Sequence, residues 1–155
     1  WVPLLGGLAV ALAVREVAEV DAVLKWPNDV LIDGRKVCGL LAEAVGGAVL
    51  LGFGLNVTTH ADELPVPAAT SLVLEGAAVT DRDTLLRAIL RRLSDVLGDR
   101  DLDGYRALCS TIGRQVRVEL PGDRAIEGTA EAVDDDGRLV VDGTAYAAGD
   151  VVHLR

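Results

Sequence analysis

Two lysines and an Asn–Asp pair lie close together in the segment KWPNDVLIDGRK, which spans residues 25–36. Lys25 and Lys36 are its first and last residues, and Asn28 and Asp29 lie between them. Ammonium groups attract carboxylates and phosphates, and a few amide or carboxylate side chains orient a bound ligand. These residue types therefore predict a site for a small anionic ligand, and both a carboxylate and a phosphate fit it.

A tight hairpin at residues 33–34 is predicted to fold Lys36 back towards the Asn–Asp pair, because Asp-Gly is a strong two-residue turn signal. With that turn, Asp29 faces Cys38 and lies diagonally from Lys36 on one face of the hairpin. With a three-residue loop and a Gly bulge, the register moves by one and Lys36 shares its face with Asn28 instead. The sequence leaves both registers open.

A second hairpin is predicted at residues 46–47, where two glycines follow each other. Its register places Gly39 opposite Gly54, and Asn56 near Val37. Facing glycines leave a gap in the side-chain layer that a flat ligand or another backbone can enter. The same residues also suit an ordinary solvated hairpin with close strand packing, since Asn and Asp are common turn residues.

The composition predicts an acidic globular protein with an aliphatic core. Half of the 155 residues are hydrophobic, only 3% are aromatic, and the formal net charge is −9. A negative surface disfavours nonspecific binding to nucleic acid and to anionic membranes. Cys38 and Cys109 lack the spacing of a metal site or a disulfide framework, so we expect a reducing, cytoplasmic environment.

The hydrophobic pattern predicts an α+β arrangement in the first two thirds of the chain. Residues 4–20 are typical of a largely buried helix, and residues 80–98 of an amphipathic helix that begins at Thr80 or Asp81 and ends at Gly98. Residues 58–79 lack periodicity and predict a loop. Between the first helix and this loop, we expect an antiparallel meander with both faces covered, formed by strands near 22–26, 30–32, 36–45 and 48–57.

The last third of the chain is β-rich. A short helix around Tyr105 is expected to precede it. Turn signals, among them one at residues 121–123, separate five short strand-like runs. These runs are 114–120, 125–133, 138–143, 144–148 and 151–155. Five short strands in about forty residues predict a small barrel that packs on the first part of the chain.

Three motifs occur in an order that resembles the biotin–protein ligases, also called biotin–[acetyl-CoA-carboxylase] ligases. They are K-W-P-N-D and G-R-K-x-x-G within residues 24–44, and G-x-G-x-N within residues 51–57. Residues 63–76 resemble the loop that follows in that family. The resemblance covers essentially the whole chain. It implies a partial catalytic core of the class II aminoacyl-tRNA synthetase type at residues 1–111, and an SH3-like β-barrel at residues 112–155.

The resemblance implies an ATP-dependent reaction in two steps. Biotin and ATP form biotinyl-5′-AMP and pyrophosphate, and the biotinyl group then passes to a lysine of a biotin carboxyl carrier protein domain. Lys36 matches the family's essential lysine, which contacts the biotin carboxylate and the α-phosphate. Gly39, Gly52 and Gly54 match backbone positions that line the biotin pocket.

The remaining motif positions match the nucleotide side of the family's site. They are Lys25, Asn28, Asp29 and Asn56. Asp29 is also expected to help hold Mg²⁺, which prefers oxygen ligands. A homodimer is compatible with the resemblance.

The family also carries an upstream Gly/Arg-rich loop over biotin and the adenylate, and no such run occurs in these 155 residues. Because the first residue is Trp1 rather than Met, we expect the catalytic domain to be truncated at its N-terminus. The alternative functions are a non-catalytic binding or dimerisation module, and a related lipoate–protein ligase.

Overall fold

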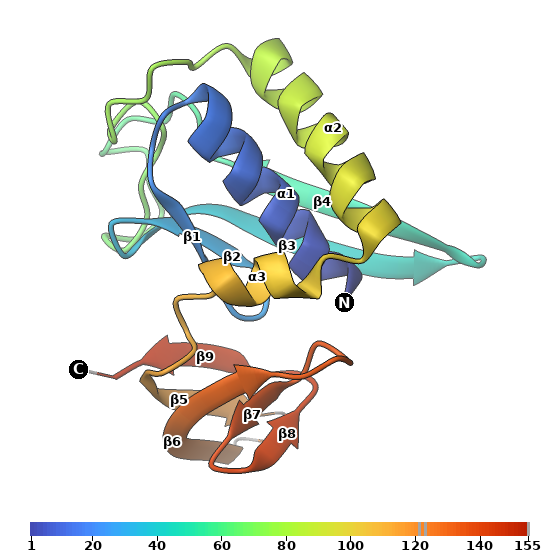
Figure 1. The fold of residues 1–155 in the computed structure, drawn as a ribbon. Helices are drawn as coiled ribbons and strands as arrows, with labels where there is room; N and C mark the ends of the chain where they lie inside the picture. The colour runs from blue at the N-terminus through green and yellow to red at the C-terminus, as the bar shows by residue number, and fades with distance from the viewer. Residues whose placement is uncertain (121, 123, 155) are drawn as a thin grey trace.

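The chain folds into two antiparallel sheets and three helices in the computed structural model, which describes residues 1–120, 122 and 124–154 (Figure 1). The first sheet has the strand order β1-β2-β3-β4, and the second has the order β8-β7-β6-β5-β9. The helices are α1 (Val2–Val17), α2 (Arg82–Asp99) and α3 (Leu102–Leu108). The strands are β1 (Ala22–Lys25), β2 (Asp29–Ile32), β3 (Arg35–Val45), β4 (Ala48–Leu55), β5 (Gln115–Leu120), β6 (Arg124–Val133), β7 (Leu139–Val141), β8 (Thr144–Tyr146) and β9 (Asp150–His153).

Helices α1 and α2 lie side by side on one face of the first sheet (Figure 1). Helix α1 is apolar almost all round and is buried from Leu4 to Val14, except for Leu12. Helix α2 is amphipathic, and the carboxylate of Asp81 caps it by accepting a hydrogen bond from the Thr84 amide at 2.8 Å. The helix ends at Arg100 in a left-handed conformation, so the predicted end at Gly98 is wrong.

The opposite face of strands β3 and β4 is open, contrary to the expectation that both faces are covered. Leu41, Val45 and Leu50 alternate with the residues that pack against the helices, and their exposed fractions are 63%, 52% and 59%. The glycines Gly39, Gly52 and Gly54 lie on this same face. The open face therefore places an apolar, glycine-containing strand surface next to the segment 25–36.

The second sheet contains all five predicted strands. Strands β8 and β9 form its two edges, and no ladder joins them within the residues that the structure describes. The sheet is therefore an open one there, rather than the closed barrel that the strand count predicts. The turn predicted at 121–123 falls on Pro121 and Asp123, and these two residues and Arg155 lie outside the described residues.

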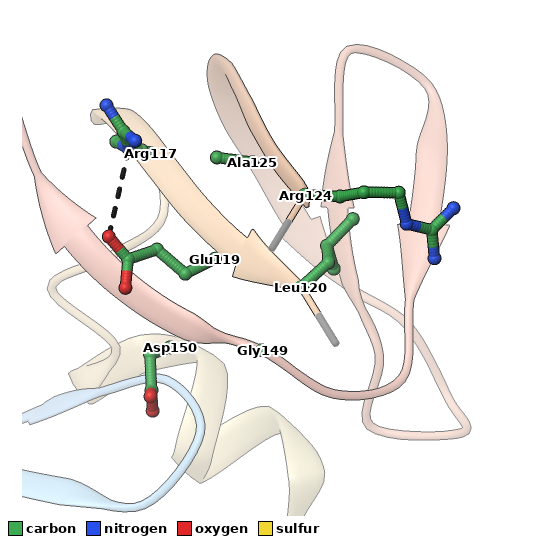
Figure 2. A pocket seen from close by; sticks show the side chains of 7 residues that line it. All are labelled: Arg117, Glu119, Leu120, Arg124, Ala125, Gly149 and Asp150. Carbon is green, nitrogen blue, oxygen red and sulfur yellow. Dashed lines mark ion pairs between the residues drawn. The ribbon is translucent and has the colours of Figure 1, made fainter. Parts of the chain in front are cut away.

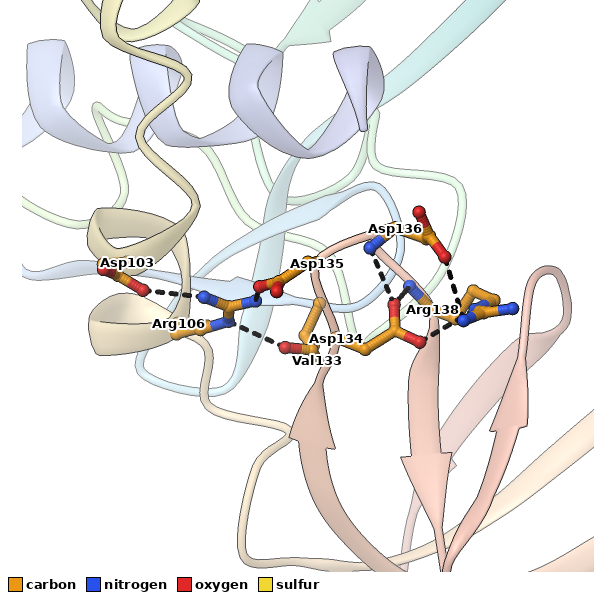
Figure 3. Close-up of polar contacts among 7 residues, drawn as sticks. All are labelled: Asp103, Arg106, Val133, Asp134, Asp135, Asp136 and Arg138. Carbon is orange, nitrogen blue, oxygen red and sulfur yellow. Dashed lines mark hydrogen bonds and ion pairs between the residues drawn. The ribbon is translucent and has the colours of Figure 1, made fainter.

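Side chains from the first part of the chain reach across to the second sheet. Trp26 is 1% exposed, and its indole nitrogen Nε1 donates to the Gly137 carbonyl at 3.0 Å. Arg106 of α3 donates to the Val133 carbonyl at 2.7 Å and pairs with Asp135 at 2.6 Å (Figure 3). A single hydrophobic cluster runs through both parts, so the second sheet packs on the first as predicted.

Within the described residues, none of the helices is long and apolar enough to cross a membrane.

Candidate functional site

The β2–β3 hairpin decides where Lys36 lies relative to the Asn–Asp pair. Residues 33 and 34 form the predicted two-residue turn, with φ of 48° and 72°. A β-bulge in the following residues then shifts the register, so that Asp29 pairs with Gly39 rather than with Cys38. The predicted pairing of Asp29 with Cys38 is therefore wrong, but Lys36 and Asp29 do share one face.

Asp29 lies between the two lysines of the segment. Its Oδ1 is 2.5 Å from Lys36 Nζ, and its Oδ2 is 3.6 Å from Lys25 Nζ. The Asp29 side chain is only 15% exposed, and its Oδ1 accepts no hydrogen bond of good geometry from the described residues. The ion pair with Lys36 therefore compensates this buried oxygen. Two ammonium groups on one carboxylate leave a local charge of +1.

Gly39 provides the space in which Lys36 reaches Asp29. A Cβ atom at this position would lie 2.9 Å from both Cε and Nζ of Lys36, which is too close for van der Waals contact. At Gly54, which pairs with Gly39 across the strands as predicted, a Cβ atom would meet nothing within 4 Å. The two glycines therefore have different roles, since only Gly39 is required by a neighbouring side chain.

This difference leads to a testable prediction. Gly39→Ala is expected to push the Lys36 ammonium away from Asp29 while the fold is retained, because the clashing atoms are the flexible end of a side chain. Gly54→Ala is the matched control and should leave the ion pair in place. NMR of the Asp29 carboxyl carbon checks both variants, and an unchanged signal in Gly39→Ala would contradict this account.

A small cavity of about 280 Å³ opens beside Lys36 on the open face. Four of the residues that line it were predicted as site residues, and four were not. Its lining residues are Lys36, Cys38, Gly39, Gly54, Asn56, Pro65, Val66 and Ala69. Gly52 lies further along β4, where a Cβ atom would meet only the Leu41 carbonyl oxygen at 3.8 Å. The cavity thus combines apolar walls and glycine backbone with one ammonium group.

The loop at residues 66–72 holds the backbone of Lys36 from both sides. The Lys36 amide donates to the Ala68 carbonyl, and the Thr70 amide donates to the Lys36 carbonyl, each at 2.8 Å. Thr70 is fully buried and donates from its hydroxyl to Glu75, which also pairs with Arg35 at 2.7 Å. The sequence pattern did not single out these anchoring residues, because the loop has no periodicity.

The two asparagines of the motifs hold the fold together in this structure. The Asn28 side-chain amide donates to the Leu40 carbonyl at 2.7 Å, and that of Asn56 donates to the Thr70 carbonyl at 3.0 Å. Asn56 also donates from its backbone to the Val37 carbonyl, as the predicted register requires. The Asn28 side chain thus joins the turn before β2 to β3, and the Asn56 side chain joins the end of β4 to the loop that holds the Lys36 backbone.

A larger hollow of about 640 Å³ lies in the second sheet, and none of its described lining residues belongs to the motifs (Figure 2). Among the described residues, two arginines, Arg117 and Arg124, and two acids, Glu119 and Asp150, line it, and Arg117 pairs with Glu119 at 3.8 Å. These described residues carry equal numbers of positive and negative charges, whereas Lys36 is the one charged residue among the described residues that line the smaller cavity. The smaller cavity is therefore the better candidate for an anionic ligand.

Comparisons with known proteins agree with the motif residues. Residues 3–59 match the biotin/lipoate A/B protein ligase family, and residues 111–154 match the biotin protein ligase C terminal domain. The chain is 44% identical to the biotin–[acetyl-CoA-carboxylase] ligase of Mycobacterium tuberculosis, over all of this chain and 63% of that protein. The chain belongs to the biotin protein ligase family. Its identity to the bifunctional ligase/repressor BirA of Escherichia coli is 27%, over 88% of this chain and 46% of that protein.

Solved structures of biotin protein ligases share the fold. The apo enzyme from Aquifex aeolicus superposes with a TM-score of 0.85 at 25% identity, covering 99% of this chain and 75% of that one. The same ligase in complex with biotin and ATP gives 0.79 at 27% identity, with coverages of 99% and 71%. The chain thus spans about half to two thirds of the length of the curated relatives named above.

Cys38 lies in the ligase motif but is a structural residue. Its side chain is 1% exposed, and burial raises the pKa of the thiol to about 12, despite the nearby positive charge of Lys36. The thiolate is therefore absent at neutral pH, and only the thiolate is a nucleophile. Cys38 thus contributes packing next to Gly39 and Lys36.

His153 of β9 is another group near the ligase motif whose pKa is shifted. Burial, together with the positive charges of Arg114 and Lys25, lowers the pKa of His153 from 6.5 to about 4. Its Nε2 lies 3.1 Å from the hydroxyl of Thr111. The ring is therefore neutral at physiological pH and can accept a hydrogen bond there.

The lowered pKa of His153 predicts a pH dependence of stability. Between pH 6.5 and 4 the unfolded chain binds a proton that the folded chain excludes, so the free energy of unfolding should fall as the pH falls. His153→Gln should reduce this slope, and His60→Gln, at an exposed loop position, should keep it. Urea denaturation at pH 7, 6 and 5 measures the slope. Parallel curves for the wild type and His153→Gln would argue against this assignment.

Proposed function

We propose that the chain carries the ATP-dependent biotin ligase chemistry of its family, in which biotin is first converted to biotinyl-5′-AMP. The observation that supports this proposal best is the ammonium group of Lys36, which Asp29 holds at the edge of the glycine-lined cavity. The M. tuberculosis relative is named a biotin–[acetyl-CoA-carboxylase] ligase, and the A. aeolicus ligase has been solved with biotin and ATP. Both facts favour biotin and ATP as the ligands here.

In the proposed first step, a carboxylate oxygen of biotin attacks the α-phosphorus of ATP. The new oxygen–phosphorus bond forms as the bond to the pyrophosphate oxygen breaks, so pyrophosphate leaves. Both reactants are anionic, and Lys36 lowers their repulsion and stabilises the charge that develops on the equatorial oxygens. Asp29 orients Lys36, and Lys25 supplies the second positive charge on the nucleotide side. Gly39, Gly52 and Gly54 line the proposed biotin pocket with backbone.

Asn28, Asn56 and Asp29 are proposed for the nucleotide side of the site. In this arrangement the asparagines shape the β3 region through their bonds to backbone carbonyls. A role of Asp29 in holding Mg²⁺ is also proposed, and in that role the cation would compete with Lys36 and Lys25 for the two carboxylate oxygens. Among the described residues no group of three or more His, Cys, Asp or Glu side chains gathers around a metal position. Mg²⁺ would therefore be held by Asp29 together with phosphate oxygens and water, and would neutralise phosphate charge.

In the proposed second step, the amine of a carrier-protein lysine attacks the acyl carbon of the adenylate, and AMP leaves. No covalent enzyme intermediate is required, which agrees with the protonated thiol of Cys38. The proposed partner is a biotin carboxyl carrier protein domain.

An assay of the chain with labelled biotin, ATP and Mg²⁺ tests this function. Formation of biotinyl-5′-AMP, detected by mass spectrometry together with pyrophosphate release, is the expected result. A parallel reaction with lipoate distinguishes the two ligase substrates, and lipoyl-AMP in place of biotinyl-AMP would favour the lipoate alternative. Binding of biotin and ATP by calorimetry without any adenylate would favour a non-catalytic binding module.

The finer architecture is also proposed. Residues 1–111 would form the catalytic domain, related to the class II aminoacyl-tRNA synthetases, and residues 112–155 an SH3-like domain. Two buried free cysteines are compatible with a reducing cytoplasm. A homodimer remains the alternative to a monomer, and sedimentation equilibrium separates the two.

A further inference from the structure

The connection between α3 and β5 runs along the end of β1 that leads into the lysine-rich segment. Ser110 donates from its amide and from its hydroxyl to the Leu24 carbonyl, at 2.7 and 2.8 Å. One residue further on, Thr111 accepts a hydrogen bond from the Trp26 amide at 3.0 Å through its hydroxyl oxygen. This connection therefore binds the backbone on both sides of Lys25.

The Thr111 hydroxyl contacts two polar groups, and chemistry fixes the direction of one of these hydrogen bonds. Thr111 is fully buried, and its hydroxyl oxygen contacts the Trp26 amide and Nε2 of His153. The amide is a donor only, so the oxygen accepts there, and it keeps its proton and a second lone pair for the contact with Nε2. The Thr111 hydroxyl donates to Nε2 in one tautomer of His153 and accepts from it in the other. The series Trp26 amide, Thr111 hydroxyl and His153 ring thus links the residue that follows β1 to β9.

This link acts on the segment that contains the proposed nucleotide-side residues. Trp26 directly follows Lys25, which lies 3.6 Å from Asp29. The indole of Trp26 is held separately by the Gly137 carbonyl at 3.0 Å. Thr111 therefore holds Trp26 by its backbone, and Gly137 holds it by its side chain. In the chain, Lys25 precedes this anchored residue and Asp29 follows it.

We propose that Thr111 and His153 are positioning residues for the ATP-binding half of the site, because they fix the backbone of Trp26, which lies between Lys25 and Asp29 in the chain. Neither residue needs to touch the nucleotide for this role. The inference rests on the proposed ligase function for its effect on ATP. Its effect on the geometry of Lys25 and Asp29 is independent of that function.

The decisive variant is Thr111→Val, which keeps the shape of the side chain and removes both hydrogen bonds. Calorimetric titrations with ATP and with biotin are run on the whole chain, next to Thr111→Ser, which retains the hydroxyl. We expect the Kd for ATP to rise about tenfold in Thr111→Val and to stay within about twofold in Thr111→Ser. The Kd for biotin should stay within about twofold in both variants, because the biotin side of the site does not depend on this link.

NMR gives a readout that does not require ATP. The carboxyl carbon of Asp29 and Nζ of Lys25 should shift in Thr111→Val and return to their wild-type positions in Thr111→Ser. The ¹⁵N shifts of His153 identify its tautomer and so give the direction of its hydrogen bond with Thr111. His153→Gln, which offers an acceptor oxygen to the same hydroxyl, should retain the wild-type Asp29 signal.

The two readouts separate the inference from the proposed function. If the wild type does not bind ATP, the proposed function fails, while the Asp29 and Lys25 signals still decide the positioning role. If Thr111→Val loses stability but keeps the wild-type signals and the wild-type Kd for ATP, Thr111 is merely structural and the inference is overturned.

Discussion

Lys36→Ala is expected to reduce adenylate formation by at least about a hundredfold, because the variant lacks the ammonium group that faces both anionic reactants. The fold should be retained, since the Lys36 side chain is 46% exposed and Asp29 keeps its contact with Lys25. The measurement is the initial rate of pyrophosphate release with biotin and ATP. Thermal denaturation of the same sample verifies that the variant is folded.

Two further variants control for the loss of one positive charge. Arg87→Ala removes a cation from the exposed surface of α2, where Arg87 pairs with Asp83 at 2.7 Å, and it should leave the rate unchanged. Lys36→Arg keeps the charge but replaces a compact ammonium by a planar guanidinium, so only partial activity is expected. Adenylate formation at the wild-type rate in Lys36→Ala would refute the assignment of Lys36.

Trp26→Ala is expected to destabilise the fold by about 3–5 kcal/mol, because it empties a large buried volume. Trp26 is one of the largest fully buried side chains, and the variant also leaves the Gly137 carbonyl without its indole donor. The free energy of unfolding is measured by urea denaturation with circular dichroism.

A graded series makes this second prediction testable even if Trp26→Ala does not fold. Trp26→Phe keeps most of the apolar contact and loses the hydrogen bond, so a smaller loss of about 1–3 kcal/mol is expected. Trp1→Ala is the matched control, because Trp1 is 41% exposed and lies over the Arg100 guanidinium. Equal losses for Trp1→Ala and Trp26→Ala would be inconsistent with Trp26 as the link between the two sheets.

Much of the site is predictable from sequence because its signals are local. The two hairpin turns need residues with positive φ, and Asp33-Gly34 and Gly46-Gly47 tolerate it. Both turns therefore follow from the sequence, and so does the pairing of Gly39 with Gly54. No local signal in the sequence shows that one face of β3 and β4 is open. Coverage of a sheet depends on which segments pack against it, and an apolar strand has the same sequence pattern whether its second face is covered or exposed.

The sequence by itself determined the ligase motifs, the two hairpin turns and the proximity of Lys36 to Asp29. Only the tertiary structure decided the bulge that places Asp29 opposite Gly39, the loop contacts that hold the Lys36 backbone, and the link through Thr111. The physical reason is separation along the chain. Turns are set by the conformational preferences of adjacent residues, whereas Trp26 and Thr111 are 85 positions apart and meet only when both sheets have packed.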